Sequence, residues 1–379
     1  MSAPVSANIS ILEAAFLRQR AAYFRDPYPN AAQRRAQLDR LIKTVLARQD
    51  EIASALDRDF GGRSKAEVRY AEILTSLRSL RHARRHLKQW MKSRPAPVPL
   101  PFQIARAWVM PQPLGVVGIV VPWNYPLFLT MGPIAAALAA GNRVMLKLSE
   151  FAPATSSVLA ALFGETFPDE VVTVVEGDAE AAKAFVRLPF DHLLFTGSVA
   201  VGCQVMREAS ANLTPVTLEL GGKSPVLVAA DAELAAAAGS IVHGKFLAAG
   251  QTCIAPDYLL VPADRTEELV RALQAEIEKQ YPRAAENPDY TSVINETQYA
   301  RLSTYLDEAR AAGVRMVETG APRGCKLPPT LVIDPPDHLR LMQEEIFGPI
   351  LPIKPYHPGG CNPIYQRAPA AFGFVSVHS

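Results

Sequence analysis

From Gly115 onward, short apolar runs alternate with segments of helical character, and this alternation constrains the fold more than any other feature of the chain. Strands that alternate with helices form a parallel sheet whose two faces the helices cover. The sequence therefore predicts a doubly wound α/β domain, which binds its ligand beyond the carboxyl ends of its strands. The expected strands are residues 116–121, 144–148, 171–175 and 192–196, and the expected helices between them are residues 134–140, 155–163 and 179–186.

Two further regions flank this domain, and a divergent segment follows them. The first hundred residues are predicted to be helical at 31–56 and 68–91, with an extended connector at 94–101. A second α/β region begins near residue 220, with strands expected at 225–229 and 258–261 and helices at 232–249, 267–279 and 301–312. Past Pro355 neither period is present, which indicates loop. We therefore place the domains at 1–219 and 220–354, with a divergent tail at 355–379.

Composition and charge exclude several classes of protein. The 379 residues suffice for two domains with a large core, and 49% hydrophobic with 20% charged residues indicates a folded chain. A formal charge of +2 gives no long-range attraction to nucleic acid or to an anionic membrane. Residues 107–142 carry no charge, but prolines and glycines interrupt them, so a buried strand, turn and helix are expected instead of a membrane span.

The four cysteines and the amino-terminal residues bear on the compartment. The cysteines are widely spaced and include no C-x-x-C pair, which argues against a zinc site and against a disulfide scaffold. Residues 1–15 lack a basic region followed by an apolar one, so no secretory signal is expected. Both observations favour the reducing cytoplasm.

A nucleophile and a base are candidates in the second half of the chain. Cys253 follows a long predicted helix and a Gly250-Gln-Thr turn, although a lone cysteine is more often a small buried hydrophobe. Glu219 lies 34 residues upstream (253 − 219) between two leucines, so we expect a partly desolvated carboxylate with a raised pKa. The alternative is a strand-edge glutamate that pairs with Lys223.

Four other motifs are weak when each is taken alone. Gly197 and Ser198 would begin a helix, where free N–H groups favour phosphate, but a plain strand-to-helix turn is equally consistent. Lys147 and Glu150 end a strand and could bind ribose hydroxyls, or they could be ordinary surface charge. Pro122-Trp123-Asn124 ends another strand, and its Asn amide could stabilise an oxyanion or cap a turn. Glu344-Glu-Ile-Phe-Gly-Pro349 indicates only a turn.

Taken together, six motifs resemble the aldehyde dehydrogenase superfamily in their order and spacing. They are Pro-Trp-Asn, Lys-x-Ser-Glu, Phe-Thr-Gly-Ser, Glu-Leu-Gly-Gly-Lys, Gly-Gln-x-Cys and Glu-Glu-Ile-Phe-Gly-Pro. The resemblance runs from the N-terminus to Pro355, and the compact N-terminal region is similar to that of the class 3 and coniferyl aldehyde dehydrogenase branch. The resemblance implies a Rossmann-like NAD(P)-binding domain, a second α/β catalytic domain, and NAD or NADP as cofactor.

The resemblance also implies roles for individual residues. Cys253 resembles the nucleophile, Glu219 the base that activates the deacylating water, and Asn124, with the Cys253 N–H, the oxyanion donors. The residues implied in cofactor binding are Lys147 and Glu150 at the adenosine ribose, Gly197, Ser198 and Gly202 at the pyrophosphate turn, Glu345 and Phe347 at the nicotinamide ribose, and Pro122 and Trp123 along the groove.

The implied reaction is the oxidation of an aldehyde to the acid through a Cys253 thiohemiacetal and thioester. Trp123, Tyr125 and Phe128 favour an aromatic or medium-chain aldehyde, for instance of the coniferyl type. A reductase of acyl phosphates or acyl-CoA is one alternative, but Glu219 favours hydrolytic deacylation. A cofactor-free cysteine hydrolase is another, and the dinucleotide motifs argue against it.

The chain departs from the family's pattern after Tyr356. Chains of this family continue past Glu-Glu-Ile-Phe-Gly-Pro with further strands and helices, a loop over the substrate funnel and a C-terminal strand used in association. Residues 357–379 do not match that segment. The hypothesis is a frameshift or an early stop, with an inactive remnant that retains only the cofactor-binding fold as the alternative function. The homo-oligomer typical of the family could then be lost with the segment.

Overall fold

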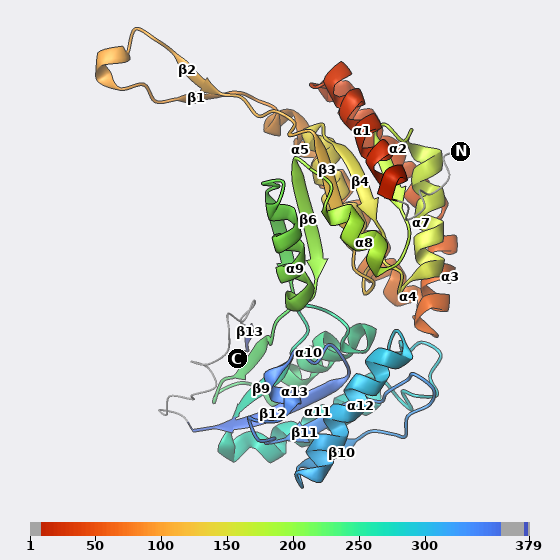
Figure 1. Cartoon of the computed structure of the whole chain (residues 1–379). Coiled ribbons are helices and arrows are strands. Elements are labelled where there is room, and N and C mark those ends of the chain that lie inside the picture. The colour runs from red at the N-terminus through yellow and green to blue at the C-terminus, as the bar shows by residue number, and fades with distance from the viewer. Residues whose placement is uncertain (1–8, 358–374, 378–379) are drawn as a thin grey trace. The chain divides into compact units, whose positions relative to one another are not determined.

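The computed structural model describes residues 9–357 and 375–377, and its chain divides into two compact units (Figure 1). The first unit comprises Met1–Leu56 and Val68–Glu219, and the second comprises Asp57–Glu67 and Leu220–Ser379. Residues 57–67, which the sequence placed in the first domain, therefore belong to the second unit. The expected tail also begins too early, because Pro355 and Tyr356 are part of a strand.

Helices dominate the first ninety residues, as predicted from their apolar spacing. The expected helix at 31–56 is interrupted at Arg48, and the one at 68–91 begins with a π-helical segment at Val68–Leu74. The Asn30 side chain caps the second helix by accepting from the N–H groups of Ala32 and Gln33. The Asn30 N–H in turn donates to the Gln33 side chain. The helices are α1 (Ile9–Arg25), α2 (Ala31–Ala47), α3 (Gln49–Phe60), α4 (Lys65–Glu67) and α5 (Thr75–Trp90).

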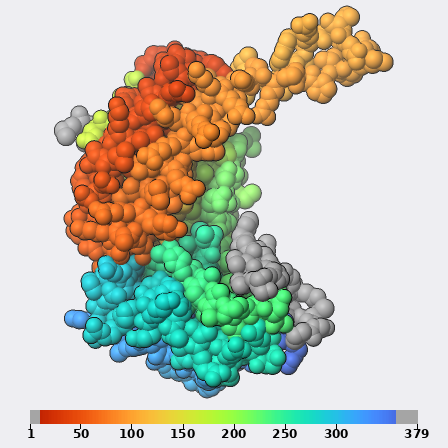
Figure 2. Space-filling model, turned by 180° about the vertical axis from the view of Figure 1, so that it is seen from behind, coloured from red at the N-terminus to blue at the C-terminus, as the bar shows by residue number. Residues whose placement is uncertain are grey.

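A two-stranded arm follows α5, where the sequence predicted only an extended connector. Strand β1 (Arg94–Ala96) pairs antiparallel with β2 (Ala107–Val109), and a 3₁₀ turn at Leu100–Phe102 lies between them. The extended backbone was predicted but the pairing was not, because a proline-rich strand can still pair along an edge. Figures 1 and 2 show the arm reaching away from the rest of the first unit. Its exposed large apolar side chains are Leu100, Phe102, Ile104, Trp108, Val109 and Met110.

The first unit is built on a five-stranded sheet, and the alternation of strands and helices predicted four of its strands. The strand order is β5-β4-β3-β6-β7, and β5, β4, β3 and β6 run parallel. Helices α1, α8 and α9 form one packed group, and α2, α5, α6 and α7 form another. The elements are β3 (Val116–Val120), α6 (Phe128–Ala140), β4 (Arg143–Lys147), α7 (Pro153–Thr166), β5 (Val172–Val175), α8 (Ala179–Val186), β6 (His192–Gly197), α9 (Val199–Ser210) and β7 (Val216–Leu220).

The second unit holds a six-stranded sheet in the order β10-β11-β12-β9-β8-β13. Strand β10 is antiparallel to β11, and the other pairs are parallel. The elements are β8 (Pro225–Val228), α10 (Leu234–Phe246), β9 (Tyr258–Pro262), α11 (Thr266–Gln280), α12 (Glu296–Ala311), β10 (Arg315–Glu318), β11 (Thr330–Ile333), α13 (Arg340–Gln343), β12 (Ile350–Tyr356) and β13 (Val375–Val377).

Strand β13 contradicts the expectation of loop for its part of the tail. Residues 375–377 pair with β8 over Val226–Val228. The remaining tail, residues 358–374 and 378–379, lies outside the described residues.

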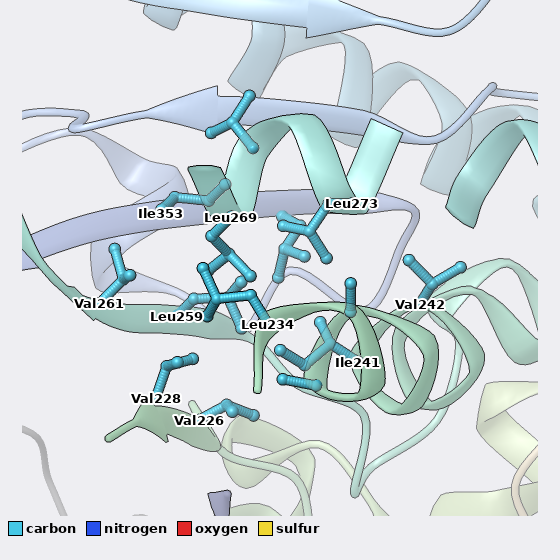
Figure 3. Packing of buried hydrophobic residues seen from close by; sticks show 14 of the residues in the cluster. Val226, Val228, Leu234, Ile241, Val242, Leu259, Val261, Leu269, Leu273 and Ile353 are labelled. Carbon is cyan, nitrogen blue, oxygen red and sulfur yellow. The ribbon is translucent and has the colours of Figure 1, made fainter. Parts of the chain in front are cut away.

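The core of the second unit lies on both faces of its sheet. In β9, Leu259 and Val261 join a cluster with α10 and α11 (Figure 3), whereas Tyr258 and Leu260 join a cluster with α12. Successive side chains of a strand point to opposite faces, so a strand that is covered on both sides is apolar throughout. This is the pattern that identified 258–261 as a strand in the sequence.

Within residues 107–142, buried strand β3 and helix α6 were predicted from the interrupted apolar pattern, whereas the exposed strand β2 was not. Across the described ranges, 9–357 and 375–377, no helix has the length and hydropathy that a membrane crossing requires.

Candidate active site

In the first unit, the predicted cofactor residues follow strands at the point where the chain order reverses. From β3 the chain proceeds outward through β4 and β5, and then returns to β6 on the other side of β3. The crevice beyond the carboxyl ends of two such strands is where open α/β sheets bind ligands. Pro122 and Trp123 follow β3, Lys147 ends β4, and Gly197 ends β6. The topology therefore brings these positions to one edge of the sheet.

Asn124 is held in the interior at this edge. Its side chain is only 4% exposed, whereas Pro122 and Trp123 are half-buried. A buried amide whose position the fold fixes is suited to stabilise a developing negative charge, because it needs little reorganisation. The geometry is compatible with the oxyanion role that the resemblance implied.

Lys147 is not a surface charge. It is 1% exposed, and its Nζ donates to the carbonyl oxygens of Leu148 at 2.7 Å and Gly177 at 2.8 Å. Burial lowers the pKa of its ammonium group. Glu150 is exposed, and its carboxylate lies 3.5 Å from Lys147 Nζ. The pair thus presents an anchored cation beneath a solvent-facing carboxylate at the end of β4.

The turn from β6 into α9 has the form of an anion site. Ser198 is the N-cap of α9, and its hydroxyl accepts from the Val201 N–H at 3.4 Å. A side chain at Gly197 would collide with the Phe195 ring, whose Cζ lies 2.5 Å from the position of an added Cβ. Gly202 is buried one turn into the helix. The exposed first turn of α9 fits an approaching pyrophosphate, whereas the lack of a side chain at Gly197 accommodates the Phe195 ring.

Glu219 differs from expectation in its surroundings. It lies in β7, an edge strand of the sheet, and its side chain is exposed. The desolvation expected from its two flanking leucines is therefore absent, because no further strand covers this edge in the described first unit. Lys223, which the alternative made its partner, forms an ion pair with the Asp257 carboxylate.

In the second unit, the predicted residues precede three neighbouring strands. Strands β12, β9 and β8 are adjacent and parallel. The segment before β8 carries Gly221 and Lys223, the one before β9 carries Cys253, and the one before β12 carries Glu345 and Phe347. These segments lie at the amino ends of the strands, in contrast to the carboxyl-end site of the first unit.

The loop that carries Cys253 is strained. The predicted helix at 232–249 ends at Phe246, after which Ala248, Ala249 and Gly250 have φ values of 51°, 53° and 76°. Consecutive left-handed residues other than glycine are costly and persist only where the surroundings enforce them. Cys253 itself is half-buried and is not part of a disulfide.

Buried hydrogen bonds hold this loop. Gln251 is fully buried, and its Nε2 donates to the carbonyl oxygens of Ala248 and Ser292, each at 3.0 Å. Its Oε1 accepts from the Ile294 N–H at 3.0 Å. The Ala248 N–H donates to Glu67 Oε2 at 3.3 Å, so the segment 57–67 supports the loop directly. The sequence motif revealed the cysteine, but not these anchors.

The loop before β12 is the second strained segment. Phe347 has a φ of 49°. Glu345 is half-buried, and its carboxylate lies against Gly221 and accepts from the Gly222 N–H. Burial, aided by the Asp257 charge, raises the pKa of Glu345 to about 7. Its protonation state therefore changes close to neutral pH.

Sequence reasoning missed a buried lysine near the nucleophile. Lys245 lies on α10, eight positions before Cys253 (253 − 245), and is 1% exposed. Burial lowers the pKa of its ammonium group to about 8. The sequence did contain a signal for its burial. Lys245 follows Val242 by three positions and Ile241 by four, which places it on the apolar face of the helix. Asp257 and Arg301 were missed as well, because nothing in their immediate sequence distinguishes them.

These geometries agree with the result of comparing the chain with known proteins. The family model for the aldehyde dehydrogenase family matches residues 15–358. The chain therefore belongs to the aldehyde dehydrogenase family.

Individual relatives show which proteins of this family the chain resembles. The chain is 51% identical over 350 residues to a probable coniferyl aldehyde dehydrogenase from Pseudomonas aeruginosa, covering 92% of this chain and 74% of the relative. It resembles the substrate-bound AldH of Staphylococcus aureus with a TM-score of 0.91 and 35% identity, over 97% of this chain and 80% of that one. It resembles a Mycobacterium tuberculosis aldehyde dehydrogenase complexed with NAD+ with a TM-score of 0.83 and 32% identity, over 93% and 74% of the two chains.

The chain is an NAD(P)-dependent aldehyde dehydrogenase, and it oxidises aldehydes. The predicted family, α/β fold and cofactor class are confirmed. Nothing in the relatives or the fold favours the alternative of an inactive remnant.

Proposed function

We propose that this enzyme oxidises an aromatic or medium-chain aldehyde of the coniferyl type, with Cys253 as nucleophile and Glu219 as base. The observation that carries the site assignment is the strained loop before Cys253, whose left-handed residues are held by Gln251 and Glu67. Strain that a fold maintains at such cost is characteristic of functional loops. The Pseudomonas relative is named for coniferyl aldehyde, which supports the substrate class. The aromatic residues Trp123, Tyr125 and Phe128 are neighbours of Asn124 in the sequence, and Trp123 and Phe128 are half-buried.

In the proposed reaction the Cys253 thiolate attacks the aldehyde carbonyl and forms a C–S bond. The carbonyl π electrons move to the oxygen, which accepts hydrogen bonds from Asn124 and from the Cys253 N–H. The bound nicotinamide cofactor supplies the hydride acceptor. Cys253 then carries the acyl group as a thioester. Glu219 takes a proton from water, the hydroxide attacks the thioester, and the thiolate leaves with release of the acid.

The proposed cofactor-binding residues are found in each unit. In the first unit, Lys147 and Glu150 would hold the adenosine ribose, while Gly197, Ser198 and Gly202 would receive the pyrophosphate beside Pro122 and Trp123. In the second unit, Glu345 and Phe347 would hold the nicotinamide ribose. The exposed helix start at Ser198 and the anchored Lys147 support these assignments. The proposed cofactor is NAD or NADP.

The first experiment measures formation of reduced cofactor from NAD and coniferaldehyde by absorbance. We expect Cys253→Ala to abolish turnover, and Cys325→Ala, a thiol outside the proposed site, to retain it. Glu219→Gln should give one rapid equivalent of reduced cofactor per site, followed by turnover slowed about 100-fold, because deacylation loses its base. Turnover by Cys253→Ala at the normal rate, or a normal steady-state rate for Glu219→Gln, would overturn the respective assignment.

We further propose that the enzyme is a cytoplasmic homo-oligomer that associates through its β1–β2 arm. The wide spacing of the four cysteines, without a C-x-x-C pair, supports the compartment. The cluster of exposed apolar side chains on the arm supports association, because monomers rarely expose such surface. Light scattering should show an oligomer that a Trp108→Glu, Ile104→Glu double variant dissociates. An unchanged mass for the double variant would refute the role of the arm, and cell fractionation tests the compartment.

A further inference from the structure

The loop that precedes β12 is held through its backbone by charged side chains from three other segments. The Ile346 N–H donates to Asp257 Oδ1 at 2.8 Å. Arg301 donates from Nη2 to the Ile346 carbonyl oxygen at 2.8 Å and from Nη1 to the Glu345 carbonyl oxygen at 3.4 Å. Lys223 Nζ donates to the Glu344 carbonyl oxygen at 2.9 Å. Backbone groups of three consecutive residues are thus fixed by side chains remote in sequence.

The three charged side chains are themselves anchored. Lys223 and Asp257 form an ion pair with side chains 12% and 4% exposed, and Lys223 also donates to the Leu341 carbonyl oxygen at 2.9 Å. A buried ion pair with further hydrogen bonds has a defined geometry, because each partner would be left as an isolated buried charge without the other. We call Lys223, Asp257 and Arg301 the loop clamp.

Arg301 is fixed on both sides of its guanidinium. Its Nε donates to Gln298 Oε1 at 2.8 Å, and its Nη1 donates to the Tyr305 hydroxyl at 3.0 Å. The Tyr305 hydroxyl in turn donates to Glu344 Oε2 at 2.7 Å. The planar fork of an arginine can serve several acceptors in this way, whereas the single ammonium of a lysine cannot reproduce the arrangement.

We infer that the loop clamp is a set of positioning residues that holds Glu345 and Phe347 in the geometry required for hydride transfer. The left-handed Phe347 would relax toward ordinary backbone angles without such restraint. Asp257 also lies four positions after Cys253 (257 − 253), and an added Cβ at Gly250 would lie 2.7 Å from the Gly348 carbonyl carbon. The clamp therefore ties the cofactor loop to the nucleophile loop within one unit. The inference rests on the proposed roles of Cys253, Glu345 and Phe347.

Two reactions of the Cys253 thiol, ester hydrolysis and aldehyde oxidation, can distinguish whether the loop clamp positions the cofactor loop or only stabilises the fold. Hydrolysis of 4-nitrophenyl acetate needs a nucleophile and water but no hydride acceptor. Oxidation of an aldehyde also needs the nicotinamide in place over the thiohemiacetal, and a misplacement of about 1 Å costs on the order of 100-fold in rate. Loss of the clamp should therefore impair oxidation far more than ester hydrolysis.

The test compares Arg301→Leu with Arg310→Leu, a matched change on the same helix. Arg310 forms surface ion pairs with Asp307 and Glu318 and touches neither loop. We expect Arg301→Leu to lower kcat for aldehyde oxidation at least tenfold and to raise KM for NAD. The deuterium isotope effect with carbonyl-deuterated aldehyde should increase, because hydride transfer becomes rate-limiting. Ester hydrolysis should stay within threefold of wild type, and Arg310→Leu should change neither reaction more than twofold.

Equal losses of oxidation and ester hydrolysis by Arg301→Leu, or an unchanged oxidation rate and isotope effect, would overturn the inference. Failure of the proposed function is distinguishable, because Cys253→Ala would then retain both activities whatever Arg301 does.

Lys223→Gln provides a second test if Arg301→Leu does not fold. The Glu345 carboxyl is influenced by Gly222 and Lys223 before β8, Asp257 before β9, Arg301 on α12, and Lys245 on α10 through their mutual charge interaction. Lys223 lowers the pKa of Glu345, so its neutralisation should move the acidic limb of kcat/KM for NAD to higher pH. An unmoved limb, together with a normal oxidation rate, would overturn the inference.

Discussion

Gly250→Ala tests whether contact between the nucleophile loop and the cofactor loop sets the rate of the enzyme. Gly250 has a φ of 76°, and an added Cβ would collide most closely with the Gly348 carbonyl oxygen and would lie 2.7 Å from the Gly348 carbonyl carbon. Ordinary contacts begin at 3.4 Å, so the two loops must separate by at least 0.7 Å (3.4 − 2.7). The neighbouring atoms are backbone, and no rotamer change can relieve the collision.

The magnitude follows from this displacement. If a misplacement of about 1 Å costs roughly 100-fold, the required shift predicts a loss of roughly 25-fold in kcat. The left-handed backbone adds about 1–2 kcal/mol of destabilisation for a residue with a Cβ, and the overpacking adds about 1–3 kcal/mol.

Gly313→Ala is the matched control, because it imposes a similar backbone conformation without the collision. Gly313 has a φ of 69°, and nothing lies within 4 Å of its added Cβ. It should lose only the backbone contribution of about 1–2 kcal/mol and retain kcat. The assays are steady-state formation of reduced cofactor and urea unfolding of both variants. If Gly250→Ala equals Gly313→Ala in both measurements, the reasoning from loop contact is refuted.

Two further changes test the pKa of Glu345 and the anchoring of α6. Because burial raises the pKa of Glu345 to about 7, its charged form appears as pH rises through that value, and kcat/KM for NAD should rise with it. Glu345→Gln should flatten this rise in a pH profile, and a persistent rise would assign it to another group. Arg34→Met should lower the free energy of unfolding by about 3 kcal/mol in urea, because buried Arg34 donates to the Ala139 and Ala140 carbonyl oxygens at 3.0 and 2.7 Å. A loss below about 1 kcal/mol would show that water replaces these bonds.

Most of the fold prediction came from local patterns of apolar residues in the sequence. Continuous apolar runs such as 116–121, bounded by turn residues, are typical of strands covered on both faces, and β3 is buried in this way. The arm escaped prediction because Arg94–Ala96 is stabilised by a pairing with Ala107–Val109 that leaves no period in either segment. The end of α10 was misplaced because Ala248 and Ala249 have good helix propensity, which tertiary contacts override.

The residues of the candidate site also divide into those that local motifs predict and those that depend on tertiary contacts. Cys253, Asn124 and Lys147 could be proposed from motifs, because their chemistry is concentrated in a few adjacent residues. Glu219 was expected to be desolvated from its neighbours in sequence, but exposure depends on its place at the edge of the sheet. The loop clamp could not be foreseen, since Arg301 acts through backbone atoms of residues 44 and 45 positions away (345 − 301 and 346 − 301).

The segment 57–67 has a consequence for recombination between relatives. Its Arg63 and Glu67 are joined at 2.8 Å, and Glu67 accepts from both Ala248 and Thr291. A single crossover at residue 219 would therefore combine one parent's support with the other parent's nucleophile loop. Chimaeras that exchange residues 57–67 together with the second half should keep the nucleophile loop and its supporting segment from the same parent. A simple exchange of halves would take the loop from one parent and its support from the other.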